Sequence, residues 1–396
     1  MRYVPLTANW GTSRFVPNGC RRPVFHGKIA GVEEVPLNTV LVTGAFGLVG
    51  SAVVRQLAAD GRDVVATDLD TPANREAAAK LPMSVEVRYA DLTDPAAVDD
   101  LVGTVNPTAI IHLAAMIPPL IYQHRELARK VNVEGTDNLL AAAGQPEPRG
   151  SYDGSSVAKP PRFVQASSIA VYGSRNPHTV SGVLTADTPT NPADIYGDHK
   201  LQAERLVRES QLDWVILRLG GVLTVDPGPY AKLDNLYFEQ LLPADGRLQT
   251  VDVRDVAAAF AAATTAPVVG ETLLIGGDDS HRRLQRDVAP AMAAAMGLVD
   301  GLPAGLPGNP ERDDDWFNTD WMDTTRAQDA LGFQHHSWPQ MLAETAAQAG
   351  LKRHLLRVVA PLAKVVLGWR APYYRSGKKF ADPWGAIAAK WGDPRP

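Results

Sequence analysis

The sequence predicts an α/β protein with a doubly wound parallel sheet and a smaller C-terminal lobe. Three observations predict this fold. Short runs rich in β-branched residues alternate with amphipathic stretches from residue 38 onward. Single helices between the strands imply parallel pairing with right-handed crossovers, so helices should cover both faces of the sheet. A glycine-rich turn also joins the first strand to the first helix.

The predicted elements follow one another in a regular order. Strands are expected at 39–43, 63–67, 85–90, 108–115, 162–167 and 214–219, and helices at 51–60, 96–103, 126–143 and 196–210. The segment 144–161 is rich in Gly, Pro and Ser and is expected to form an exposed loop. After residue 220 the alternation weakens, which indicates a second lobe facing the carboxyl ends of the strands, where such folds bind ligands. We expect an N-terminal extension (1–36), a nucleotide-binding domain (37–220, re-entered at about 250–265), a mainly substrate-binding lobe (221–350) and a basic C-terminal extension (351–396).

The composition excludes several classes of protein. The chain of 396 residues carries a net charge of -5, so nucleic acid is not an expected partner. Its single cysteine, Cys20, cannot form an intramolecular disulfide. The histidines lack a convincing set of partner ligands, so no metal is expected. No window approaches the ~20 apolar residues that cross a bilayer. A cytoplasmic location is therefore expected.

The first 36 residues are basic. Five Arg and Lys residues precede the first acid, Glu33, as in some organellar transit sequences. The Pro and Gly content of this segment disfavours an amphipathic helix. A non-targeting arm is therefore expected.

A glycine turn follows the first strand. VLVTGAFGLVG places Gly44, Gly47 and Gly50 between a strand and the opening of a helix. Such a turn lets backbone N–H groups and the helix N-terminus approach a pyrophosphate closely. Glycines that serve only a tight turn are the alternative, and the strand before, the helix after and an acid beyond the second strand favour the first interpretation. The turn predicts a Rossmann dinucleotide site.

Two acidic residues at strand ends indicate how the nucleotide would be bound. Asp68 ends the second strand, where a carboxylate can accept hydrogen bonds from ribose hydroxyls and repel a 2′-phosphate. NAD is therefore favoured over NADP, although Arg75 could support NADP or be an exposed helix charge. Asp91 follows the third strand, where it could reach the adenine amino group or cap a helix. Both interpretations of Asp91 stay open.

A catalytic group is predicted at the opening of the helix 196–210. Tyr196 and Lys200 share a helix face, so phenol and ammonium can converge on one ligand. A phenol ionises near ~10, and a nearby cation brings its phenolate within reach at neutral pH. Ser167 and Ser168 end the fifth strand, where a hydroxyl can hold a substrate oxygen. Ser168 is favoured for that role, and Ser167 is the alternative or a buried hydrogen-bonding group.

Together these motifs resemble the extended short-chain dehydrogenase/reductases, which include the NAD-dependent epimerase/dehydratases. The resemblance covers roughly residues 38–350. It rests on TGAFGLVG, Asp68, ADLTD, HLAA (112–115), VNVEGT (131–136), SSIAVYG, YGDHK and VDVRDVA (251–257).

The resemblance assigns roles to individual residues. It implies an NAD-dependent enzyme in which Ser168, Tyr196 and Lys200 form the catalytic triad, with Lys200 also gripping the nicotinamide ribose. The cofactor-binding residues that it implies are Gly44, Phe46, Gly47, Leu48 and Gly50 at the pyrophosphate, Asp68 at the ribose, Asp91 and Leu92 at the adenine, Leu113, Ala114 and Ala115 along the trench, and Asn132 as a brace.

Two substrate classes remain. Sugar-nucleotide members of the family usually carry an asparagine after the sixth strand and an arginine before the Val-x-Asp-Val stretch, both near the diphosphate. Here these places hold Gly220 and Gly221, and Leu248 with Arg247 one residue away. Because a diphosphate needs charge-assisted partners, a dehydrogenase or reductase of a non-nucleotide alcohol or ketone is favoured. A nucleotide-sugar epimerase or dehydratase is the alternative, and a non-catalytic cofactor-sensing scaffold is a third.

Two later segments have open roles. Trp316, Phe317, Trp321 and Met322 either wall a substrate pocket or fill the packing between lobes. Residues 351–391 carry nine Lys and Arg residues against Asp382 alone. A basic amphipathic helix there could contact a membrane surface, or dock on its own body or on a second subunit, which is the favoured interpretation. A homodimer is expected.

Overall fold

The computed structural model describes residues 39–144, 159–226 and 233–396. The arm predicted for 1–36 and most of the loop predicted for 144–161 lie outside these ranges. The described residues belong to one compact unit. None of the described helices is both long and apolar enough to span a lipid bilayer.

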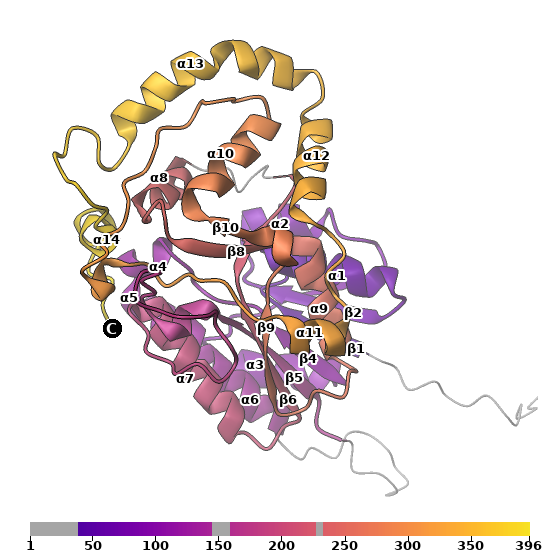
Figure 1. Cartoon of the computed structure of the whole chain (residues 1–396). Coiled ribbons are helices and arrows are strands. Elements are labelled where there is room, and N and C mark those ends of the chain that lie inside the picture. The colour runs from indigo at the N-terminus through magenta and orange to yellow at the C-terminus, as the bar shows by residue number, and fades with distance from the viewer. Residues whose placement is uncertain (1–38, 145–158, 227–232) are drawn as a thin grey trace, which may run out of the picture. The chain divides into compact units, whose positions relative to one another are not determined.

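A seven-stranded parallel sheet forms the centre of the unit (Figure 1). The strand order is β3-β2-β1-β4-β5-β6-β9, so the chain reverses direction across the sheet between β1 and β4. The doubly wound α/β fold predicted from the sequence is confirmed. The strands are β1 (Thr39–Thr43), β2 (Asp63–Asp68), β3 (Glu86–Tyr89), β4 (Ala109–His112), β5 (Arg162–Ser168), β6 (Trp214–Leu219) and β9 (Glu271–Ile275).

Helices cover both faces of this sheet. Because successive side chains of a strand point to opposite faces, Val40 and Val42 of β1 belong to one buried cluster and Leu41 to another. The first cluster packs against α1 (Leu48–Ala59) and α9 (Val253–Ala263), and the second against α3 (Pro95–Val105), α6 (Gly135–Gly144) and α7 (Ile195–Glu209).

The remaining elements build the C-terminal lobe and the edges. A small sheet pairs β8 (Arg247–Asp252) in parallel with β7 (Gly221–Leu223) and antiparallel with β10 (Arg282–Leu284). The chain then returns to the large sheet through α9 and β9, and so extends beyond the re-entry predicted at 250–265. The other helices are α2 (Pro72–Ala78), α4 (Leu120–Gln123), α5 (Arg125–Arg129), α8 (Leu233–Leu241), α10 (Gln285–Ala295), α11 (Thr325–Leu331), α12 (Trp338–Ala349), α13 (Lys352–Arg370) and α14 (Pro383–Trp391).

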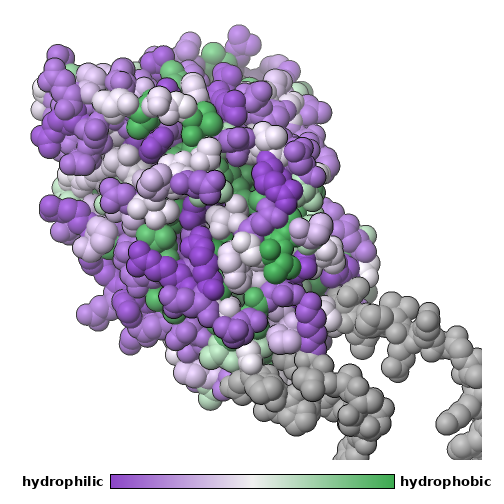
Figure 2. All heavy atoms as spheres, turned by 60° about the horizontal axis from the view of Figure 1, so that its bottom comes forward, coloured by the Kyte–Doolittle hydropathy of each residue, from purple (hydrophilic) through white to green (hydrophobic). Residues whose placement is uncertain are grey.

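Two predicted elements differ in detail from the structure. The strand expected at 108–115 ends at His112, because residues 113–115 leave the sheet to line a cavity. The helix expected at 126–143 is divided into α5, a π-helical turn at Lys130–Glu134 and α6. On the face shown in Figure 2, hydrophilic residues predominate, with small groups of hydrophobic residues between them.

Candidate active site

The glycine turn between β1 and α1 is fixed by two close backbone contacts. Gly44 has a φ of +64°, and a Cβ on it would lie 2.6 Å from the backbone N of Ala114. A Cβ on Gly50 would lie 2.1 Å from the carbonyl oxygen of Gly44. Neither position tolerates a side chain. A Cβ on Gly47 would meet only the Gly44 oxygen, at 3.4 Å, so Gly47 instead leaves space free at the N-terminus of α1.

A cavity of about 720 Å³ opens from this turn along the carboxyl ends of the strands. Most of the predicted site residues line it, although they come from six separate stretches of the chain. Phe46 and Asn132 are not among its lining residues. Those that line it are Gly44, Gly47, Leu48, Gly50, Asp68, Asp91, Leu92, Leu113, Ala114, Ala115, Ser168, Tyr196 and Lys200.

Asp68 lies at the cavity wall beside the glycine turn. Its carboxylate accepts hydrogen bonds from the backbone N–H of Leu69 at 2.8 Å and of Phe46 at 3.4 Å, and from Nδ2 of Asn74 at 3.2 Å. Burial raises its pKa, and these hydrogen bonds oppose the rise. Arg75 is held away from it, because Nε and Nη2 of Arg75 donate to Asp70 at 2.5 and 2.7 Å. No cation therefore faces Asp68 from the described part of α2.

Asn132 and Phe46 support the wall rather than lining it. Asn132 sits in the π-helical turn, where its Oδ1 accepts from the backbone N of Met116 at 2.7 Å and its Nδ2 donates to the Met116 carbonyl at 2.9 Å. This pair of hydrogen bonds fixes the segment that follows β4. The Phe46 side chain is buried in the core beneath the turn. Asp91 accepts from the backbone N and the Oγ1 of Thr93, as a turn-forming acid does.

The two serines at the end of β5 have different surroundings. Ser167 is buried, and its Oγ donates to the Glu204 carboxylate at 2.5 Å. Glu204 is also paired with the buried Arg218, through contacts of 2.8 and 2.7 Å. Ser168 is half-buried, its hydroxyl accepts from the backbone N of Ala170 at 3.2 Å, and it lines the same cavity as Tyr196. The structure thus leaves Ser168, and not Ser167, beside the predicted acid–base group.

Tyr196 and Lys200 lie together at the start of α7. The Lys200 Nζ is 6.0 Å from the centre of the Tyr196 ring and donates to the Ala166 carbonyl at 2.9 Å. Burial lowers the pKa of Lys200 to about 8. Burial also raises the pKa of Tyr196 to about 12, against the opposing effect of the nearby Ser168 hydroxyl. Without a further positive charge, the phenol is therefore protonated at neutral pH.

A buried carboxylate that the sequence analysis missed holds the start of α7. Asp194 caps the helix by accepting from the backbone N of Gly197 at 3.0 Å. It also accepts from the Tyr122 hydroxyl at 2.7 Å and from Nδ2 of Asn318 at 3.2 Å. Burial raises its pKa to about 6. An Asp three residues before Gly197 at a helix start is an N-cap signal that could have identified it.

The second lobe closes the cavity near the end of β6. A Cβ on Gly220 would lie 2.7 Å from both the Gln249 carbonyl oxygen and the Met322 methyl group, and one on Gly221 would lie 3.0 Å from Leu248. No polar side chain could be accommodated at either glycine without a shift of these neighbours. Arg247 points elsewhere, since its Nη1 donates to the Gly182 carbonyl at 3.0 Å.

Two roles were predicted for the aromatic segment, lining a substrate pocket or filling the packing between lobes. In the structure its residues mainly fill packing. Trp316 is buried, and its Nε1 donates to the Asn309 carbonyl at 2.8 Å. Phe317 packs against Trp384 of α14, with the ring centres 5.1 Å apart. Tyr196 packs against the same apolar cluster, so the C-terminal helix helps to hold the candidate site.

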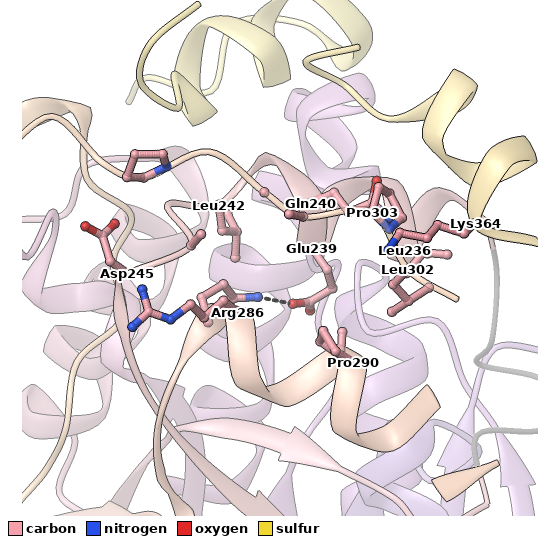
Figure 3. Close-up of a pocket in the computed structure, with 16 residues that line it drawn as sticks. Leu236, Glu239, Gln240, Leu242, Asp245, Arg286, Pro290, Leu302, Pro303 and Lys364 are labelled. Atoms are coloured by element: carbon pink, nitrogen blue, oxygen red, sulfur yellow. Dashed lines mark hydrogen bonds between the residues drawn. The ribbon is translucent and has the colours of Figure 1, made fainter. Parts of the chain in front are cut away.

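A separate hollow of about 380 Å³ lies between α8, α10 and residues 302–307 (Figure 3). Glu239 accepts a hydrogen bond from Nε2 of Gln285 at 2.6 Å, and Lys364 of α13 reaches the rim. In the close-up, Arg286 points toward Asp245 and away from Glu239. This hollow shares no lining residue with the cavity at Tyr196. The described residues contain no cluster of three or more His, Cys, Asp or Glu side chains that could hold a metal ion.

The fold and this cavity define a class of protein: Rossmann enzymes with a Ser, Tyr and Lys group at the nucleotide crevice. The model of the NAD dependent epimerase/dehydratase family matches residues 40–276. The chain belongs to this family, and the resemblance seen in its motifs is confirmed.

Three relatives illustrate what the chain is similar to. A dTDP-glucose 4,6-dehydratase of Neisseria gonorrhoeae is 31% identical over 291 residues, which span 67% of this chain and 80% of the relative. A short-chain dehydrogenase/reductase superfamily protein of Agrobacterium tumefaciens with bound NAD is 27% identical, with a TM-score of 0.59, and the match covers 80% of this chain and 98% of that one. MoeE5 in complex with UDP-glucuronic acid and NAD is 26% identical, with a TM-score of 0.59, and covers 80% of this chain and 100% of its own.

Proposed function

We propose that this chain catalyses hydride transfer between NAD and a substrate carbon that carries a hydroxyl or carbonyl group. The observation that carries the proposal is the phenol of Tyr196. It lies with Ser168 in the same cavity that the glycine turn and Asp68 line. A tyrosine with a purely structural role is not expected to line the same cavity as a glycine turn that is suited to a pyrophosphate.

Two places in the cavity suit NAD. Gly47 leaves room at the N-terminus of α1, where a helix favours the negative charge of a pyrophosphate. Asp68 offers a carboxylate to ribose hydroxyls, and its charge disfavours a 2′-phosphate. Arg75 is bound to Asp70 and would have to break that pair to compensate. These contacts support NAD over NADP.

The side chains at the other end of the cavity supply acid–base chemistry. NAD, when bound, supplies the hydride acceptor or donor. In the oxidative direction, Tyr196 as phenolate takes the hydroxyl proton of the substrate at its Oη, while the Ser168 hydroxyl holds the substrate oxygen. In the reductive direction the same phenol returns the proton. The Lys200 ammonium stabilises the phenolate, since opposite charges favour the ionised form.

The first substrate candidate is a nucleotide sugar, acted on by an epimerase or dehydratase that retains NAD and uses it transiently. The relatives support this class, because a dTDP-glucose 4,6-dehydratase matches two thirds of the chain and MoeE5 binds UDP-glucuronic acid and NAD. They favour it over the non-nucleotide substrate that Gly220, Gly221 and Leu248 led us to expect.

A second candidate, net oxidation or reduction of a non-nucleotide alcohol or ketone, keeps the support of one local observation. The places where a diphosphate would need polar partners are filled by the Gln249 backbone, the Met322 methyl group and Leu248. A binding site for a diphosphate without charge-assisted partners there would have to find them elsewhere in the lobe.

One experiment separates the two candidates. Purified protein with NAD is incubated with UDP- and dTDP-linked sugars, and separately with free sugars and secondary alcohols. The absorbance of reduced nicotinamide and the products by chromatography are both followed. Conversion of a nucleotide sugar without net cofactor reduction supports the first candidate, and stoichiometric reduction with a free alcohol supports the second. Retention of either activity by Tyr196→Phe would contradict the proposed chemistry.

A further inference from the structure

Helix α13 presents an apolar stripe to solvent. Leu351, Leu355, Val358, Leu362 and Trp369 each expose 65% or more of their surface. Their spacing of three and four residues, continued by Val365, places them on one face of the helix. An exposed stripe of this length is uncommon on a soluble surface and marks an interaction site.

The opposite face of α13 lies against the rest of the lobe. Ala360 is its buried residue, and Leu356, Ala363 and Leu367 are half-buried. Figure 1 shows α13 at the edge of the described unit, where it links α12 to α14. The helix therefore docks on the lobe through one buried and three half-buried residues of one face. The apolar residues of the exposed stripe are left uncovered by the described part of the chain. The docking on its own body that the sequence favoured accounts for only one of its two apolar faces.

Basic residues flank the stripe. By helical periodicity, Arg357 lies on one side between the two faces, with Arg353 nearer the docked face, and Lys352 and Arg370 lie on the other side. No ion pair to another described residue is recorded for any of these four. The helix carries no acid, whereas residues 351–396 contain ten Lys and Arg residues against two Asp residues. Lys364 lies on the same side as Arg353 and Arg357 and reaches the rim of the hollow in Figure 3.

We propose that α13 binds the surface of an anionic lipid bilayer, with its apolar stripe in the acyl boundary and its flanking cations at the headgroups. An in-plane helix needs an apolar face, a basic border and aromatic residues near the interface. The stripe and the four cations supply the first two, and Trp369 with Tyr374, both exposed, supply the third. Anionic headgroups complement the charge of this border.

A second copy of the chain fits the stripe less well. If two α13 helices paired through their stripes, the cations of both borders would face one another with no acid on either helix. Like charges so placed oppose association. Charge complementarity therefore selects the lipid surface over self-pairing.

Vesicle sedimentation of the full chain tests the proposal. We expect the protein to pellet with vesicles of phosphatidylcholine and phosphatidylglycerol, to remain in the supernatant with phosphatidylcholine alone, and to be released by high salt. The triple variant Lys352→Gln, Arg353→Gln, Arg357→Gln should lower the partition coefficient by about a hundredfold, because each basic residue near an anionic surface adds to binding. The matched control Arg55→Gln, Lys80→Gln, Arg205→Gln removes three exposed cations elsewhere and should bind like the parent.

A second measurement separates insertion from electrostatic adsorption. Brominated lipids should quench the fluorescence of the parent protein more than that of Trp369→Phe, since Trp369 then lies at acyl depth. Equal binding by the two triple variants, or equal quenching of the parent and Trp369→Phe, would overturn the proposal. So would a concentration-dependent dimer that Leu355→Ser and Leu362→Ser dissociate, which would assign the stripe to a second copy.

Discussion

Lys200 and Tyr196 lie one turn apart on α7, with the Lys200 ammonium 6.0 Å from the centre of the phenol ring and tied to the Ala166 carbonyl at 2.9 Å. Both groups are shifted toward their neutral forms by burial, which raises the pKa of Tyr196 to about 12 and lowers that of Lys200 to about 8. The site is therefore built so that an added positive charge decides whether the phenol ionises.

The first prediction concerns that ionisation. We expect NAD⁺ to lower the pKa of Tyr196 below about 12, because its positive ring favours the phenolate. The oxidation rate should then rise with pH until the phenol is fully ionised. Ultraviolet titration of tyrosinate, as the difference between the parent and Tyr196→Phe, measures the shift with and without NAD⁺. An identical titration in both conditions would remove the charge coupling on which the mechanism depends.

The second prediction separates the two serines. Ser168→Ala should lower kcat by about a hundredfold, the effect of removing one preorganised donor, while the melting temperature changes little. Ser167→Ala should leave kcat near the parent value and destabilise the fold by about 1–3 kcal/mol, because the buried Glu204 loses a hydrogen-bond donor. Steady-state kinetics and thermal unfolding of both variants give the test, and the reverse pattern would exchange the two assignments.

The third prediction concerns cofactor choice. Asp68→Ser should raise the ratio of kcat/KM for NADP to that for NAD by about tenfold or more, since it removes the carboxylate that opposes a 2′-phosphate. Asp70→Asn is the matched control, because it frees Arg75 without changing Asp68. Should Asp70→Asn move the ratio further than Asp68→Ser, the cofactor preference would depend on Arg75 instead.

The fourth prediction concerns stability and pH. Burial favours the protonated form of Glu204, but the hydrogen bonds and charge of Arg218 outweigh it and lower the pKa of Glu204. An acid whose folded pKa is depressed contributes stability above its unfolded pKa of about 4.3 and loses it as pH falls. Arg218→Met should therefore cost about 3–5 kcal/mol near neutral pH and less in acid.

Denaturant unfolding at several pH values measures this dependence. The control Arg326→Met breaks an exposed pair with Glu271 and should cost about 1 kcal/mol or less at any pH. A loss for Arg218→Met that grows toward acid pH would contradict the direction assigned to Glu204.

Much of the fold could be predicted because its signals are local. The six strands before residue 220 and the glycine turn can each be recognised within a few residues, from β-branched runs or from the spacing of Gly. The motif spacing also placed Tyr196, Lys200 and Ser168 in one cavity. These features depend on period and backbone sterics, which a single sequence carries.

The parts that could not be predicted depend on contacts between distant segments. Asp194 is joined to Tyr122 and Asn318, more than 70 and 120 positions away, and no local pattern reveals such a triangle. Asn132 in the π-helical turn is hydrogen-bonded to the backbone of Met116, which lies in another segment of the chain. The space at Gly220 is likewise closed by Met322, a residue of the second lobe.

The end of the described chain returns to the helix that carries Tyr196. The backbone N of Ile195 donates to the Pro394 carbonyl at 2.8 Å, and α14 packs in the same apolar cluster as the phenol. Cutting the chain after Arg370 would therefore remove contacts that support the start of α7, together with the tail. Bilayer docking studies should for this reason alter α13 by substitution, since truncation would confound loss of lipid affinity with loss of turnover.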